Sequence, residues 1–288
     1  MDHAYDLRVD ALDYICWGPA QRGVLLLSIA EVKEACIPKL VADMPERGIG
    51  FVTMHKAGSV FVDQVLSQLM VSEGFEHVDL ALQAFQMGVR EHLYCVAHAH
   101  ELSRPRCYFG PFRGPYIRKM PGLERLRLVA QVRDPRDCII SLYYSLIYSH
   151  PPPAQGPAKE KYERNLAVTQ SADLETFVRK QARQYAVRMH VLQDVFQRAQ
   201  NGILLRYETM VGAPLEWLSS LCEFLRIDLS PQIANWVSKE MCTNDLVEDV
   251  SRHKRQVFPG DFRRKLTASM QDQLTSMLRP HLDAFGYS

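Results

Sequence analysis

Two loops in the sequence carry residues that bind anions, each just before a predicted helix. In the first, "TMHKAGSVF", Lys56 supplies a cation, Gly58 a backbone that a ligand can approach closely, and Ser59 a hydroxyl. In the second, "VRDPRDCIIS", Arg133 is followed about two helical turns later by Ser141. Free N–H groups at helix N-termini also favour anions. Either loop alone is typical of a solvated turn, but together they predict a ligand with two separated anionic groups.

The order of residues in the first loop limits which anion it binds. The phosphate loop of nucleoside-triphosphate enzymes has the form G-x-x-x-x-G-K-[ST], whereas here Lys56 comes before Gly58. The sequence therefore disfavours an ordinary kinase or ATPase, and an atypical P-loop kinase stays as an alternative.

Four segments resemble the sulfotransferase family, in the same order along the chain. "HKAGSVF" resembles the family's "PKSGTTW", and "VRDPRDCIISLYYS" closely resembles its second signature. "LLRYETMVGAPLEWLSSLCEFLRI" is similar to its "YEDL" segment and following helix, and "RQVFPGDFRRKLT" to its "RKG..GDWK" element. The resemblance runs from Phe51 to Leu266. It implies an α/β fold with a central parallel sheet flanked by helices, in a P-loop-like sulfotransferase architecture.

The resemblance also implies a donor, 3′-phosphoadenosine 5′-phosphosulfate (PAPS), whose product is adenosine 3′,5′-bisphosphate (PAP), and no metal. Lys56 is the expected catalytic residue, because its ammonium can stabilise charge on the leaving group. Phe61 and Tyr207 match aromatic residues that contact adenine, although both types are also common in cores. The expected donor-binding residues are, for the 5′-phosphosulfate, Lys56, Gly58 and Ser59; for the 3′-phosphate, Arg133, Ser141 and Arg255; for adenine, Phe61 and Tyr207; and, in addition, Ala57, Val60 and Gly260.

The base that takes the acceptor's proton is where the sequence departs from the family. Many cytosolic members place a histidine in a strand segment like "KTHLP", whereas the corresponding "RCYFGPFRGP" has Pro111 near that position. We expect His150 as the base, because it ends the second predicted helix, where the family's acceptor pocket begins. His55, beside Lys56, is the alternative, since a cationic neighbour favours neutral imidazole.

Other residues keep different solutions open. His98 and His100 share one face if a strand continues through them, which is more typical of a structural role, and His253 lies in a basic cluster. Arg113 could orient an anionic acceptor. An acceptor of low pKa would need little base catalysis.

The apolar pattern predicts the elements that position these residues. Four short runs are expected as buried strands: Gly50–Met54, His92–Ala97, Leu126–Val132 and Ile203–Tyr207. Helical spacing follows Lys56 and recurs over about 172–199, and Asp134 with Pro135 suits a helix start. The proline-rich stretch His150–Asn165 predicts a long surface loop that could cover the acceptor. Strands alternating with helices predict a parallel sheet.

Composition bounds the rest. The 34 Lys and Arg nearly balance the 33 Asp and Glu, which disfavours nucleic acid as a partner. The seven cysteines lack a C-x-x-C pair and indicate reduced thiols. No signal or membrane-spanning pattern precedes the first strand. We therefore expect a cytoplasmic enzyme acting on a small-molecule hydroxyl or amine, as one domain over 1–288, with 1–45 as an extension packed on it.

Two expectations stay open. A homodimer is compatible with the sequence, which does not determine the oligomeric state. A degenerate, non-catalytic member that binds nucleotide or protein is the main alternative to an enzyme. It is motivated by Val60, Pro111 and Val257, which replace a threonine, a histidine and a glycine of the family.

Overall fold

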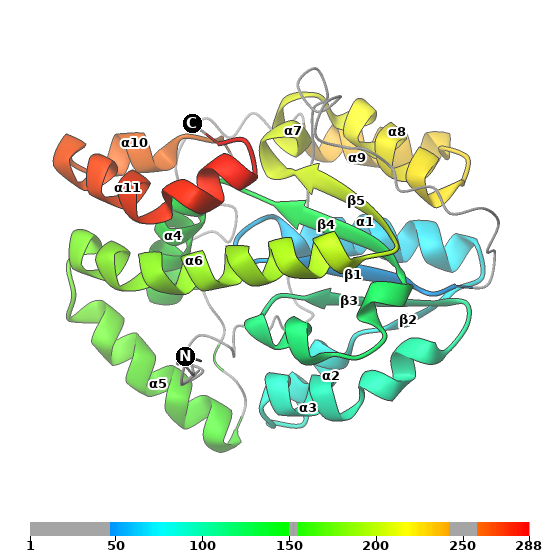
Figure 1. The fold of residues 1–288 in the computed structure, drawn as a ribbon, viewed down its shortest axis with the longest axis horizontal. Helices are drawn as coiled ribbons and strands as arrows, with labels where there is room; N and C mark the ends of the chain where they lie inside the picture. Colours follow the sequence, from blue (N-terminus) through cyan, green and yellow to red (C-terminus); the bar gives the residue numbers. More distant parts are fainter. Residues whose placement is uncertain (1–46, 150–151, 153–154, 242–257, 288) are drawn as a thin grey trace, which may run out of the picture.

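A five-stranded parallel sheet forms the centre of the computed structural model, which describes residues 47–149, 152, 155–241 and 258–287. The strand order is β2-β3-β1-β4-β5, and every neighbouring pair is parallel (Figure 1). The predicted fold class is thereby confirmed. The strands are β1 Ile49–Thr53, β2 Glu76–Val78, β3 Cys107–Phe112, β4 Arg127–Val132 and β5 Asn201–Arg206.

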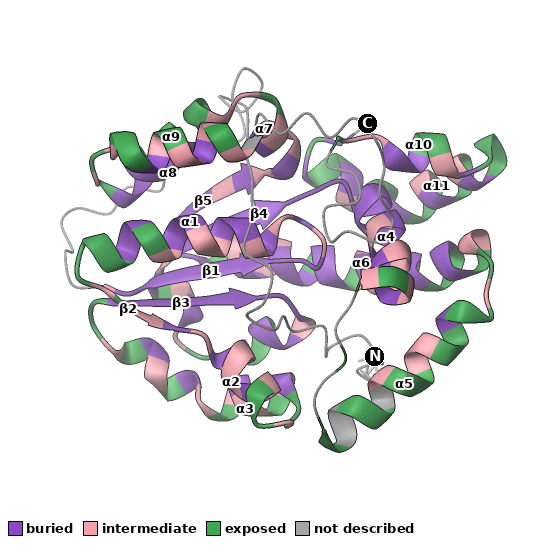
Figure 2. Cartoon of the chain, turned by 180° about the vertical axis from the view of Figure 1, so that it is seen from behind, coloured by how far each residue is buried: buried purple, intermediate pink, exposed green. Residues whose placement is uncertain are grey.

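Helices cover both faces of the sheet, as parallel sheets require. One face packs against α1 (Ser59–Ser72), α8 (Pro214–Leu225) and α9 (Pro231–Met241), which Figure 2 shows in front of the strands. The other face packs against the longest helix, α6 (Leu174–Arg198), which crosses the front of Figure 1. The remaining α-helices are α2 Leu80–Gln86, α3 Glu91–Ala97, α4 Pro135–Tyr144, α5 Gly156–Gln170, α7 Tyr207–Gly212, α10 Asp261–Lys265 and α11 Ala268–Ala284.

The strand expected at His92–Ala97 is wrong, because this segment lies in α3. Glu91, Cys95 and Ala99 are the buried positions, and a spacing of four residues is helical. His98 and His100 therefore do not share a strand face. The His98 ring instead stacks on Tyr94 at 3.9 Å between centroids.

Two strands were not among the predicted apolar runs. β2 is only three residues long. β3 contains Gly110 and Pro111, which usually break strands. Gly110 is required there, because a Cβ atom on it would lie 2.8 Å from the backbone oxygen of Phe51 on β1.

The loop expected at His150–Asn165 is also partly wrong, because α5 begins at Gly156. Proline is tolerated in a first helical turn, and the Ala, Lys and Glu residues that follow favour helix. The start of that stretch, at 150–151 and 153–154, lies outside the described residues, as does the N-terminal extension.

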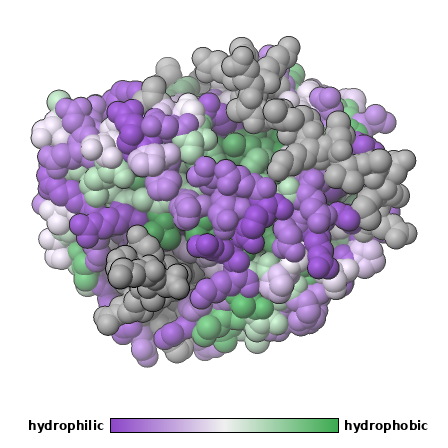
Figure 3. Space-filling view, viewed as in Figure 1, coloured by the Kyte–Doolittle hydropathy of each residue, from purple (hydrophilic) through white to green (hydrophobic). Residues whose placement is uncertain are grey.

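The surface over α6 and its neighbours is mainly hydrophilic in Figure 3, with hydrophobic side chains in separate patches. Among the described helices, none combines the length and the apolar composition that a membrane crossing needs.

Candidate active site at the carboxyl ends of β1 and β4

The first anion loop forms a tight turn between β1 and α1. Both Lys56 (φ 70°) and Gly58 (φ 78°) have left-handed backbones. Gly58 is the residue before α1, whose first N–H groups have no carbonyl partner within the helix. A Cβ atom on Gly58 would lie 2.6 Å from Cε of Met210, so the turn needs glycine for both its conformation and its space. A lysine held at positive φ is a strain that is common at ligand sites.

Gln131 of β4 stabilises this turn through hydrogen bonds. Its Nε2 donates to the carbonyl oxygen of Ala57 at 3.1 Å and to Sδ of Met210 at 2.8 Å. Its Oε1 accepts from Nε1 of Trp217 on α8 at 3.2 Å. The side chain is fully buried, so each of these bonds satisfies a group that water does not reach. Gln131 was not among the residues predicted from the sequence.

The second loop meets the first one directly. Arg133 follows β4, and its Nη1 donates to the carbonyl oxygen of Lys56 at 3.0 Å. Its guanidinium carbon lies 4.0 Å from the centroid of the Tyr207 ring, a cation–π contact. The two predicted anion-binding loops therefore form one site at the carboxyl edge of adjacent strands.

Acidic residues order the second loop. Asp134 caps α4, accepting from the backbone nitrogen of Arg136 at 2.9 Å, and it also pairs with the Arg136 side chain. The backbone nitrogen of Asp134 donates to Glu208 at 2.8 Å, and Glu208 in turn accepts from the Tyr287 hydroxyl at 2.9 Å. Burial raises the pKa of Glu208. These bonds attach the start of α4 to α7 and to the end of the chain.

Asp137 attaches the C-terminal "PGDF" segment to the same site. Its carboxylate accepts from the backbone nitrogens of Gly260 at 2.7 Å and Phe262 at 3.0 Å. It also lies 3.9 Å from Nη2 of Arg133. Segments more than 120 residues apart in the chain thus converge on one carboxylate.

Comparison with known proteins identifies the family of this chain. The model of the sulfotransferase domain family matches residues 49–286. The chain belongs to the sulfotransferase family. The prediction of a sulfuryl-transferring enzyme is thereby confirmed, and the family match does not favour the kinase or the non-catalytic alternative.

A solved sulfotransferase structure shares the fold at low sequence identity. Mouse sulfotransferase SULT7A1 complexed with PAP is 14% identical, with 82% of this chain and 85% of that chain covered and a TM-score of 0.58. Retinol dehydratase in a complex with retinol and PAP is 15% identical over 83% of this chain and 82% of that chain, with a TM-score of 0.42. No curated protein sequence matched the chain.

Most predicted donor-site residues of this sulfotransferase lie on the two loops and the elements joined to them. Phe61 is only 4% exposed and stacks on Trp236 of α9 at 5.4 Å between centroids, so it belongs to the core at the start of α1. Its contact with adenine stays a prediction, as does that of Tyr207. The first loop and the start of α1 contain Lys56, Ala57, Gly58, Ser59, Val60 and Phe61. Arg133 lies before α4 and Ser141 within it, Tyr207 begins α7, and Gly260 comes just before α10.

The structure gives less information on the two predicted bases than on the donor-site residues. His55 is 2% exposed, and its carbonyl oxygen accepts from the hydroxyl of Tyr185 on α6 at 3.0 Å. His150, His253 and the predicted phosphate ligand Arg255 lie outside the described residues. The role of His55 or His150 as base stays a prediction.

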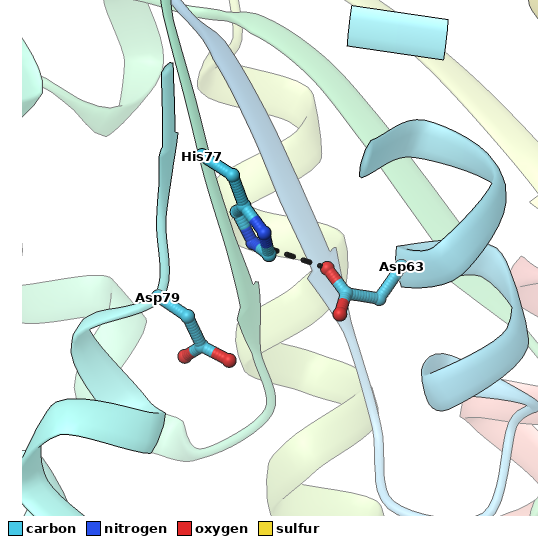
Figure 4. Close-up of side chains that lie close together, drawn as sticks. All are labelled: Asp63, His77 and Asp79. Atoms are coloured by element: carbon cyan, nitrogen blue, oxygen red, sulfur yellow. Dashed lines mark ion pairs between the residues drawn. The ribbon is translucent and has the colours of Figure 1, made fainter. Parts of the chain in front are cut away.

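One group of side chains has the composition of a metal site, although the sequence predicts no metal. The possible ligand atoms of Asp63 (α1), His77 (β2) and Asp79 lie within 4.8 Å of one another (Figure 4). Asp63 Oδ1 lies 3.4 Å from Nε2 of His77 and accepts from the hydroxyl of Tyr108 at 2.7 Å. Burial raises the pKa of Asp63 to about 7 and also raises the pKa of Asp79.

The hydrogen bonds in this group favour a structural role. His77 Nε2 lies 3.1 Å from the carbonyl oxygen of Gly110, which can only accept. Nε2 must therefore carry the proton and has no lone pair for a metal, while Nδ1 accepts from the hydroxyl of Ser67 at 3.0 Å. Asp79 caps α2 by accepting from the backbone nitrogen of Leu82 at 2.8 Å. We interpret the group as a hydrogen-bonded link between α1, β2 and β3.

Proposed function

We propose that this sulfotransferase binds PAPS across its two loops and transfers the sulfuryl group to a hydroxyl or amine of a small molecule. The observation that carries the proposal is the hydrogen bond from Arg133 Nη1 to the Lys56 carbonyl oxygen. It joins the loop with a lysine at a helix N-terminus to the loop with an arginine. The PAP bound to SULT7A1 has two anionic groups, which would provide one for each loop of this chain.

The residues present fit such a donor. The turn at Gly58 brings backbone close to a ligand, and the start of α1 offers N–H groups to an anion. Nε of Arg133 is buried and has no acceptor in the part of the chain that the structure describes. A phosphate oxygen would provide one. Lys56, Gly58 and Ser59 would hold the phosphosulfate, and Arg133 with Ser141 and Arg255 the 3′-phosphate.

Each residue then has a defined task in the transfer. The donor supplies an activated sulfuryl group on a phosphate leaving group. Lys56 stabilises the negative charge that develops on that leaving group, assisted by the α1 N-terminus. His150, or His55 in its place, receives the proton from the acceptor. We further propose that the enzyme works in the cytoplasm, because the four cysteines that the structure describes, Cys95, Cys107, Cys138 and Cys222, are free thiols.

Substitution of Lys56 tests the proposal. We expect Lys56→Ala to lower turnover of PAPS with a panel of phenols, alcohols and amines by at least about a hundredfold, the effect of losing one charge-stabilising group. Lys119→Ala, at an exposed lysine, is the matched control. Near-normal turnover in Lys56→Ala would refute the assignment. Calorimetric titration with PAP and with ATP tests the donor separately, because an atypical kinase would prefer ATP.

A further inference from the structure

Arg188 on α6 is a buried cation that the proposed mechanism does not use. Its residue is 5% exposed, and its Nε and Nη1 are buried with no hydrogen-bond acceptor among the described residues. No carboxylate in those residues forms an ion pair with it. Arginine keeps its proton in proteins, so it cannot relieve this state by becoming neutral.

A buried charge without a partner is costly for the folded protein. A structural arginine in a core normally has a carboxylate or several carbonyl oxygens around it. Nε and Nη1 of Arg188 have neither a carboxylate nor a carbonyl oxygen as a partner among the described residues. An anion that binds to the guanidinium in the working enzyme would explain why the arginine is buried.

Arg188 lies beside the catalytic turn. Its guanidinium carbon is 5.2 Å from the ring centroid of Tyr185, whose hydroxyl donates to the carbonyl oxygen of His55, the residue before Lys56. Burial raises the pKa of Tyr185, and the charges of Arg188 and Arg133 both oppose that rise, as nearby cations do. Figure 1 shows the N-terminal half of α6 next to α4, at the carboxyl end of the strands.

Two further buried polar groups, on α6 and on the segment after α4, also lack partners among the described residues. Gln181, Tyr185 and Arg188 recur at helical spacing, so they share one face of α6. Oε1 of Gln181 is buried without a hydrogen-bond donor, and so is the hydroxyl of Ser145, which follows α4, the helix packed against α6. This inner face of α6 thus offers a cation and hydrogen-bonding groups that no described residue satisfies.

The donor does not account for this set in the proposed function. α1, whose N-terminus would hold the phosphosulfate, packs on one face of the sheet, whereas α6 packs on the other. The two anionic groups of PAPS already have the first loop and Arg133. The acceptor is the remaining molecule that must lie beside Lys56.

We propose that Arg188 binds an anionic group of the acceptor, a carboxylate, sulfate or phosphate, and that Gln181 and Ser145 bond to the same molecule. The planar guanidinium would hold that group through two parallel hydrogen bonds. This inference rests on the proposed function and specifies its substrate class: small molecules that carry a negative charge apart from the hydroxyl or amine that accepts sulfuryl.

The first test uses inorganic sulfate as the probe on the full chain saturated with PAP. We expect sulfate to raise the melting temperature of the wild type and of Arg183→Met, an exposed control on the same helix, by a saturable increment that Arg188→Met lacks. Equal increments in all three proteins would overturn the proposal. An increment that occurs only before PAP is added would assign Arg188 to the donor and overturn it too. If PAP did not bind at all, that result would count against the proposed function. The comparison of wild type with Arg188→Met in sulfate without PAP would still test whether Arg188 binds an anion.

The second test separates a binding role from a structural one. Without anions, Arg188→Met should be at least as stable as the wild type, because an uncompensated charge is removed; a clear loss would indicate a structural partner and contradict the inference. With 4-hydroxybenzoate as acceptor, we expect Arg188→Met to raise KM about tenfold or more, and with neutral 4-hydroxybenzamide about twofold or less. If Arg188→Met does not fold, Arg188→Lys replaces it, with a smaller rise in KM for the benzoate alone. Equal changes for both acceptors would overturn the proposal.

Discussion

Replacement of Gln131 by leucine tests whether the turn between β1 and α1 depends on the side chain from β4 that packs against it. Leucine fills a similar volume but cannot donate to the Ala57 carbonyl oxygen or accept from Trp217 Nε1. Both of these groups would stay buried, because Trp217 and Ala57 are not exposed to solvent. The substitution therefore removes one side chain and leaves two polar groups unsatisfied.

The magnitude follows from those two groups. A buried polar group left without a partner costs about 1–3 kcal/mol. Together they predict a loss of roughly 2–6 kcal/mol in the free energy of unfolding, since the apolar volume itself is nearly conserved. For a domain of this size, at about 2 °C per kcal/mol, that corresponds to a fall in melting temperature of about 4–12 °C. Affinity for PAP should also fall, because the Ala57 carbonyl no longer anchors the turn.

Denaturant unfolding and calorimetric titration with PAP measure the two effects. Gln86→Leu, at an exposed glutamine on α2, is the matched control. We expect it to leave both PAP affinity and the free energy of unfolding nearly unchanged. Gln131→Leu with unchanged PAP affinity and a stability loss under about 0.5 kcal/mol, the range of ordinary surface substitutions, would refute the reasoning.

Two further predictions concern carboxylates. The pKa of Asp63 is raised from 3.8 to about 7. Between these two pH values the folded protein therefore holds a proton that the unfolded chain has lost. The free energy of unfolding then falls as pH rises, by at most about 1.4 kcal/mol per pH unit. Asp63→Asn should therefore gain stability relative to wild type between pH 4 and pH 8, and a pH-independent difference would contradict this. Asp137→Ala should weaken PAP binding and speed amide hydrogen exchange in α10, because Gly260 and Phe262 lose their acceptor; unchanged exchange there would mean that α10 is held by other contacts.

The sequence predicted those parts of the fold whose pattern is local. β1, β4 and β5 are nearly uninterrupted apolar runs, and strands buried on both faces have that composition. β3 escaped because Gly110 and Pro111 interrupt it, and what permits them is the close approach of β1, a feature of the assembled sheet. α3 was misassigned because seven residues show too few helical turns to reveal a period.

The site was predictable as two loops but not as one surface. The prediction that Lys56 and Arg133 bind anions came from residue types at helix starts, and their placement at one sheet edge followed from parallel topology. Their direct hydrogen bond, and the contact of Asp137 with the C-terminal segment, depend on side-chain geometry between distant segments. The burial of Arg188 could not be predicted from the sequence, since an arginine within a long amphipathic helix is usually exposed to solvent.

Gln131 did carry a signal, in the alternation of β4. Side chains two residues apart share a face of a strand, so Val129 and Gln131 face the side that α1 covers, where Val129 belongs to the same core as α1. Arg133, the first residue after β4, continues this spacing. Along this face the residues change from apolar to polar to charged toward the carboxyl end. Gln131 donates to the carbonyl oxygen of Ala57, and Arg133 donates to that of Lys56. Gln131 on β4 and Arg133 just beyond its end therefore bond successive carbonyls of the turn, so the strand beside the turn determines the shape of the turn.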